Sequence, residues 1–157
     1  MSEAGAANRG RAGKKAMSEP FLEWKTVYRL GVEMLDYEHQ DLFARLNELN
    51  EELLRHDERE KIEAGLGEVY ARLQAHFALE ERFMREHKFP GYAEHKAEHD
   101  QLLDDFMEFM LRFERDATLS YGEPEQATLK HWVVDHVLTS DLEMGRFVAS
   151  HPISGKP

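Results

Sequence analysis

Cysteine is absent from the 157 residues of this chain. Its absence excludes disulfide bonds, thiolate zinc sites, iron–sulfur clusters and c-type haem attachment. Long apolar runs are also missing, since no uninterrupted stretch reaches the roughly 18 residues that mark a membrane span. The N-terminus lacks a charged and then apolar leader, which favours a cytoplasmic protein over a secreted one. Any metal ion bound here must therefore be held by nitrogen and oxygen atoms.

Positive charge is scarce, with 20 lysines and arginines against 31 aspartates and glutamates, for a net charge of −11. Nucleic-acid binding requires a basic face, so we exclude a nucleic-acid partner. Apolar residues make up 41% of the chain and charged residues 32%, which is within the range of globular proteins, and the length indicates one domain. What the chain has in excess is histidine, with nine residues.

The chain divides into three parts by composition. Residues 1–20 are rich in alanine and glycine, carry several basic side chains and contain few large apolar residues, so we predict a disordered arm. Residues 21–150 form the predicted domain, and residues 151–157 form a short tail. Within the domain, residues 21–36 mix apolar and polar positions and predict an ordered, mostly non-helical arm packed against the rest of the domain.

Four segments place apolar residues at helical spacing: about 36–56, 57–86, 92–114 and 124–147. Pro90 and Gly91 separate the second segment from the third, and Pro124 is well placed for the first turn of the fourth. No strand pattern competes. Because the first three segments are joined by short connections, we predict an all-α, up-down-up-down four-helix bundle with an N-terminal arm.

Seven ionisable residues fall on the apolar faces of these segments. They are His39, His76, Glu80, His95, His99, His136 and Asp141. A buried imidazole or carboxylate is costly unless it is paired or bound to metal. A single one is explained most simply as a hydrogen-bonded core residue, but in this topology all seven come to one end of the bundle. We therefore predict a metal site.

Asp141 has the least regular position of the seven. It follows His136 by five residues, which is about 140° around an ideal helix, so it joins the site from the edge of the face or through a local irregularity. The other four histidines lie at the opposite pole, near a turn, off the face or in the tail, and we expect them at the solvated surface: His56, His87, His131 and His151.

If each carboxylate bridges a pair of metal ions, a count of ligands leaves one coordination position open. Five imidazoles, two such carboxylates and one shared solvent oxygen supply eleven bonds, one fewer than two octahedral ions need. Imidazole and carboxylate ligands suit iron first, with manganese, zinc or cobalt as other occupants. An open position on a redox-capable pair can take a small diatomic ligand. The walls that would keep it dry are Leu42, Phe77, Trp132, Val133 and Val137.

These residues and their spacing resemble the hemerythrin family over roughly residues 21–147. The segments that carry the resemblance are Trp24, Gly31, Val32, 35–39, 76–81, 95–99 and 136–141. The HxxxE, HxxxH and HxxxxD spacings, in that order on a four-helix frame, are a highly specific signature. As an acidic single domain, the chain resembles the bacteriohemerythrins within that family.

The resemblance implies a non-haem di-iron centre, bridged by an oxo or hydroxo group, that binds O2 reversibly. One six-coordinate iron would be held by His95, His99 and His136, the second iron by His39 and His76, and the bridge would be made by Glu80 and Asp141. The open position would then belong to the iron with two histidines, beside the dry O2 pocket.

We expect a binding protein for O2 carriage, storage or delivery, and not an enzyme, because the predicted pocket has no obvious acid–base residue. Two alternatives stay open. One is a di-iron enzyme such as a peroxidase, a nitric-oxide-consuming protein or a ferroxidase, although carboxylate-rich di-iron oxidases use Glu-x-x-His pairs instead. The other is an O2 or redox sensor that acts through a separate protein partner.

Overall fold

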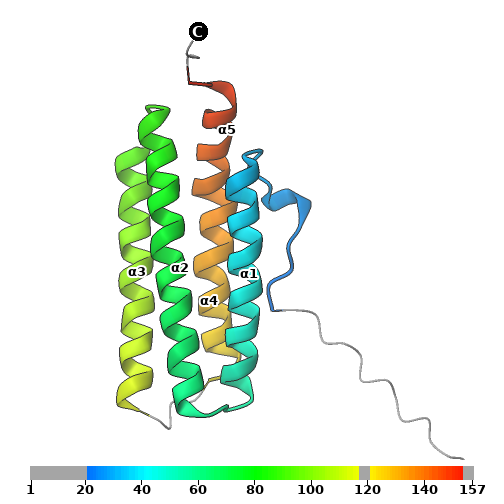
Figure 1. The fold of residues 1–157 in the computed structure, drawn as a ribbon, viewed down its shortest axis with the longest axis vertical. Coiled ribbons are helices and arrows are strands. Elements are labelled where there is room, and N and C mark those ends of the chain that lie inside the picture. The colour runs from blue at the N-terminus through cyan, green and yellow to red at the C-terminus, as the bar shows by residue number, and fades with distance from the viewer. Residues whose placement is uncertain (1–20, 117–120, 154–157) are drawn as a thin grey trace, which may run out of the picture.

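Four helical rods form a bundle in the computed structural model, which describes residues 21–116 and 121–153, and each rod runs opposite to the one before it in the chain (Figure 1). They are α1 (Glu33–Leu54), α2 (Arg59–Glu86), α3 (Tyr92–Arg115) and a composite rod of α4 (Glu123–His136), the π-helical turn η2 (Val137–Asp141) and α5 (Leu142–Ser150). The predicted all-α four-helix bundle is confirmed. The predicted disordered arm over residues 1–20 and the last four residues of the predicted tail lie outside the described residues.

The start of α1 differs from the prediction, because the helix begins at Glu33 and not near Asp36. The buried carboxylate of Asp36 accepts hydrogen bonds from the backbone N–H groups of Leu30 (2.7 Å) and Gly31 (3.2 Å). Gly31 adopts a φ of +85°, which glycine reaches without steric cost. Asp36 therefore lies inside the first turns of the helix and holds the preceding bend in place.

The segment before α1 runs along the outside of the bundle (Figure 1). Its only regular element is a single 3-10 turn, η1 (Thr26–Tyr28), among the residues described there. The backbone N–H and C=O of Leu22 both bond to the side-chain amide of Asn47, at 2.6 and 2.8 Å. The rings of Trp24 and Tyr28 pack against the ring of Phe43. The predicted ordered, mostly non-helical arm is present over these residues.

The apolar core has two parts with a polar layer between them. The larger part fills the bundle from Leu42 on α1 and Phe77 on α2 toward the α1–α2 connection. The smaller part closes the opposite end and consists of Leu30, Leu35, Met84, Phe89, Met144 and Val148. At this end Gly145 lies so close to Leu30 that a Cβ atom would come within 2.9 Å of the Leu30 carbonyl oxygen. The predicted metal ligands occupy the layer between the two parts.

The end of the bundle far from this layer is held by a buried polar pair. The hydroxyl of Tyr121 donates a hydrogen bond of 2.8 Å to the side-chain oxygen of Asn50. Within the described ranges, no helix combines the length and the apolar character that crossing a membrane demands.

Candidate metal centre

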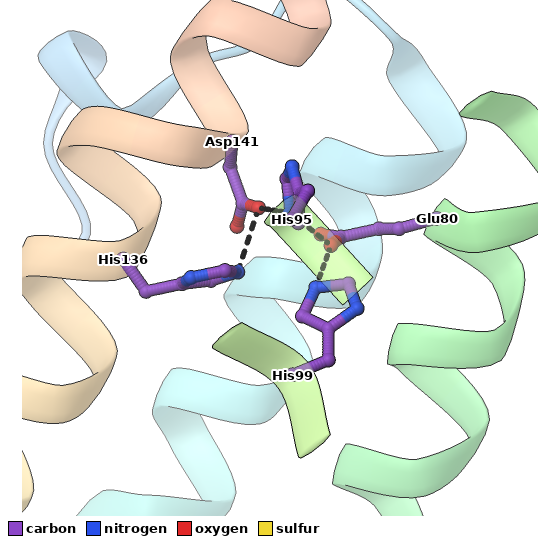
Figure 2. Close-up of side chains that lie close together, drawn as sticks. All are labelled: Glu80, His95, His99, His136 and Asp141. Atoms are coloured by element: carbon purple, nitrogen blue, oxygen red, sulfur yellow. Dashed lines mark ion pairs between the residues drawn. The ribbon is translucent and has the colours of Figure 1, made fainter. Parts of the chain in front are cut away.

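All seven predicted ligands meet in one buried layer, and they come from all four rods. His39 lies on α1, two lie on α2, two on α3 and two on the composite rod: His76, Glu80, His95, His99, His136 and Asp141. The most exposed of them, His136, is only 7% exposed. Figure 2 shows five of these side chains pointing toward a common centre.

The π-helical turn resolves the spacing of Asp141. In a continuous α-helix Asp141 would lie about 140° away from His136. Instead, the backbone N–H of Leu142 donates to the carbonyl of Val137, five residues earlier, and the helix is locally widened over Val137–Asp141. Asp141 Oδ1 consequently lies 3.0 Å from Nε2 of His136 (Figure 2). Of the two alternatives for Asp141, the edge of the helix face or a local irregularity, the structure has the irregularity.

The carboxylate of Glu80 divides the imidazoles into two groups. Its Oε1 lies 3.0 Å from Nε2 of His39 and 2.7 Å from Nε2 of His76. Its Oε2 lies 3.4 Å from Nε2 of His95 and 2.8 Å from Nε2 of His99. One oxygen atom thus faces each group.

The carboxylate of Asp141 makes the same division. Its Oδ2 lies 3.1 Å from Nε2 of His39, and its Oδ1 lies 2.9 Å from His95 and 3.0 Å from His136. Two overlapping sets of donor atoms result, each with all its atoms within 4.8 Å of one another. The two-histidine group comprises His39 and His76, and the three-histidine group comprises His95, His99 and His136, with both carboxylates common to the two.

Many of these atoms lack a hydrogen-bond partner in the described part of the chain. They include Nε2 of four histidines and three of the four carboxylate oxygens: His76, His95, His99, His136, Glu80 Oε2 and both oxygens of Asp141. An unsatisfied buried polar atom costs about 1–3 kcal/mol, so such a concentration in one place requires an explanation. Metal ions between the two groups would satisfy these atoms at once, and the donor set fits them.

The charges of the site also favour a bound cation. Burial alone lowers the pKa of His39 and His95, but the adjacent carboxylates of Asp141 and Glu80 outweigh it and raise these pKa values to about 10 and about 9. Burial alone raises the pKa of Glu80, but the surrounding histidines hold it well below its usual range. The two buried carboxylates therefore favour positive charge among the imidazoles, and a metal cation would supply it.

Two further carboxylates lie behind the three-histidine group, and sequence reasoning missed both. Glu98 accepts a hydrogen bond of 2.9 Å from Nδ1 of His136 and another from the hydroxyl of Ser140. Partial burial raises the pKa of Glu98, but these two hydrogen bonds outweigh it and lower the pKa. Glu81 accepts a hydrogen bond of 3.2 Å from Nδ1 of His99. The available signal was their position directly beside predicted ligands, since metal-bound histidines usually donate through their second nitrogen.

An apolar cavity of about 30 Å³ opens onto the site from the larger part of the core. All five predicted wall residues line it, and five residues that were not predicted extend it: Leu42, Phe77, Trp132, Val133 and Val137, then Leu46, Leu73, Leu102, Phe106 and Leu129. The predicted ligands that border it are His39, His76, His136 and Asp141. This space exceeds the roughly 10–15 Å³ that a water-sized molecule occupies by the same measure.

The remaining four histidines lie outside the site. His56, His131 and His151 are exposed, as predicted. His87 is half-buried and not fully solvated, because its Nδ1 bonds to the carbonyl of Phe83 at 2.8 Å one turn earlier on α2.

Known proteins resemble this one along most of its length. Residues 30–148 match the profile of the hemerythrin HHE cation binding domain. The chain is 31% identical over 121 residues to the bacteriohemerythrin of Aquifex aeolicus (strain VF5), covering 73% of this chain and 88% of that one. It is 26% identical over 132 residues to the bacteriohemerythrin of Stenotrophomonas maltophilia (strain R551-3), covering 83% of each.

Animal relatives and solved structures agree with these matches. The hemerythrin of Siphonosoma cumanense is 28% identical over 125 residues, which cover 80% of this chain and 91% of that one. A crystal structure of wild-type hemerythrin superposes with a TM-score of 0.73 at 22% identity, covering 82% of this chain and 98% of that one. The fold is thus shared with hemerythrin, and the matched profile spans the four rods and the buried ligand layer. This chain belongs to the hemerythrin family.

Proposed function

We propose that this chain binds O2 reversibly at a pair of non-haem iron ions. The observation that carries the proposal is the division made by the two buried carboxylates. Glu80 and Asp141 each present one oxygen atom to the two-histidine group and the other to the three-histidine group. A carboxylate that faces two donor groups in this way is suited to bridge two metal ions.

In this proposal, each group of histidines would hold one ion. The three-histidine group offers one more nitrogen than the two-histidine group, so the ion held by His39 and His76 would be the one with room for O2. An oxo or hydroxo bridge from solvent would complete the shared set. When bound, the iron pair supplies the electrons that reversible O2 binding exchanges. Nitrogen and oxygen donors without thiolate are consistent with iron.

The cavity supports binding over catalysis. It borders both histidines of the two-histidine group, His39 and His76, and one histidine of the other group, His136. Among the described residues, every polar side chain that borders it belongs to the predicted ligand set or is the indole of Trp132. No separate acid or base is therefore placed to move a proton, while the apolar walls exclude water and anions. Relatives named hemerythrin and bacteriohemerythrin are consistent with this role.

Anaerobic reduction followed by air, with iron analysis and optical spectroscopy, tests the proposal. We expect two iron ions per chain and a charge-transfer spectrum that appears with O2 and reverses when O2 is removed. The variant His131→Ala, which removes an exposed histidine, should match the natural chain. Fewer than two irons, or a spectrum that does not reverse, would contradict the proposal. Steady O2 consumption with a reductant would instead favour an oxidase or peroxidase.

A further inference from the structure

The two histidine groups differ in what lies behind their imidazole rings. In the three-histidine group, Nδ1 of His99 bonds to Glu81 and Nδ1 of His136 bonds to Glu98. In the two-histidine group, Nδ1 of His39 and Nδ1 of His76 are buried and have no hydrogen-bond partner in the described part of the chain. Nδ1 of His95, the third histidine of the other group, has none there either, so the outer carboxylates hold two of its three histidines. The outer carboxylates thus stand on one side of the centre.

Both outer carboxylates act across helices. Glu81 lies on α2 and reaches His99 on α3, and Glu98 lies on α3 and reaches His136 on the composite rod. The π-helical turn that brings in Asp141 also places Ser140 where its hydroxyl donates to Glu98. Each bond therefore ties a predicted ligand to the neighbouring rod, so the orientation of the ring depends on the tertiary structure.

A carboxylate at Nδ1 changes the imidazole as a ligand. It fixes the tautomer with the proton on Nδ1 and leaves the lone pair of Nε2 free for the metal. It also makes Nε2 more basic, and so a stronger metal ligand than in an imidazole without the carboxylate. It also restricts rotation of the ring. His39 and His76 receive none of these effects from a carboxylate within the described residues, and they border the apolar cavity.

We propose that Glu81 and Glu98 are positioning residues that make the three-histidine position the tighter of the two metal positions. The ion there is bound first and released last, and the two-histidine position beside the cavity is the more labile one. This inference rests on the proposed pair of metal ions. It concerns the difference between the two positions, which binding of O2 by itself does not reveal.

Release of Fe(II) to an excess of a colorimetric chelator, from the reduced protein under anaerobic conditions, measures this difference. The natural chain should lose iron in two phases of equal amplitude. The variant His76→Ala, which keeps the three-histidine group, should lose its one remaining iron in the slow phase and so assign that phase. In Glu98→Gln and Glu81→Gln the slow phase should accelerate roughly 10-fold or more, with the fast phase within about 2-fold of the natural value.

Glu94→Gln is the matched control, because Glu94 is an exposed glutamate one helical turn before Glu98 on α3. It removes the same charge near the site, and its release phases should match those of the natural chain. The two glutamine variants lie on different helices, so loss of folding in one leaves the other as the test. Thermal melting of the metal-free variants distinguishes the proposed role of these two glutamates from a purely structural one. A purely structural hydrogen bond would lower stability when it is lost and leave the iron release rates unchanged.

The outcomes separate the inference from the function on which it rests. A single release phase in the natural chain, an unchanged slow phase in both glutamine variants, or equal acceleration of both phases would overturn the inference. Acceleration by Glu94→Gln to the same extent would reduce the effect to net charge and overturn it as well. A natural chain that holds fewer than two irons would overturn the proposed function instead, before any variant is compared.

Discussion

The two sides of the buried layer use the same imidazole chemistry in different surroundings. On one side, His39 and His76 border an apolar cavity, and no carboxylate bonds their Nδ1 atoms within the described residues. On the other side, outer glutamates hold two of the three histidines through Nδ1, and one of these two, His136, also borders the cavity. Identical side chains thus differ in what packs behind them, and on our proposal this difference sets how firmly each group holds its metal ion.

The layer as a whole is also set between two apolar clusters. Leu35 and Met84 close it on one side, and Leu42 and Phe77 on the other. This placement removes water from charged groups whose burial is costly unless they are paired or bound to metal. Single substitutions can test the shared carboxylates, the cavity wall and the distant end of the bundle one at a time. We expect their effects on the metal centre to decrease in that order.

Glu80→Ala should have the largest effect, because it removes the carboxylate that both histidine groups share. We expect the iron content to fall from two ions per chain to nearly none, while the helical circular dichroism spectrum is retained. Glu86→Ala, on the exposed end of the same helix, is the control and should keep both irons. Two irons in Glu80→Ala would show that the division of the imidazoles has no role in binding metal.

Phe77→Leu should affect both sides of the centre. The ring of Phe77 stacks on His99 with 4.0 Å between centroids, and it also lines the cavity. Replacement by leucine should lower the free energy of unfolding by roughly 1–2 kcal/mol and enlarge the cavity. The oxygenated form should decay about 10-fold faster because water reaches the site more easily, at a cost of roughly 1.4 kcal/mol in the barrier. Chemical denaturation and the decay of the optical spectrum measure these two effects, and unchanged decay would count against the role of the ring.

Val133→Ala should act on the cavity side alone. Val133 is half-buried and lines the cavity, whereas Val134 is half-buried next to it and does not. We expect the oxygenated form to decay a few-fold faster in Val133→Ala, with iron content unchanged and a loss of stability of about 1 kcal/mol. Val134→Ala is the matched control with the same loss of volume. If the oxygenated form decayed at the same rate in the two variants, the cavity wall would have no particular role in protecting the site.

Tyr121→Phe should leave the centre unchanged. It removes the hydroxyl that donates to buried Asn50 at the distant end of the bundle. The amide oxygen then loses its donor, so we expect the free energy of unfolding to fall by about 1–3 kcal/mol. Iron content and the rate of oxygenated decay should stay at the natural values. Altered iron binding in this variant would mean that the two ends of the bundle are coupled.

Helical periodicity explains how much of the site could be predicted. His99, for example, lies on the same face as Leu102 and Leu103, so its burial follows from local spacing. Glu81 and Glu98 could not be found in this way, because in the sequence a glutamate beside a predicted ligand resembles an ordinary solvated residue until its partner on another helix is known. The early start of α1 was missed for a related reason, since Asp36 holds a bend formed by residues that precede the helix.

The sequence by itself determined the four amphipathic rods, the absence of thiolate ligands and the common level at which seven ionisable residues lie, because these follow from composition and local spacing. Only the tertiary structure decided that Asp141 turns inward on a π-helical segment, which imidazoles share each carboxylate oxygen, and which Nδ1 atoms meet an outer glutamate. Those features depend on contacts between rods. A shift of roughly an ångström between two rods decides whether a carboxylate oxygen lies within reach of an imidazole nitrogen.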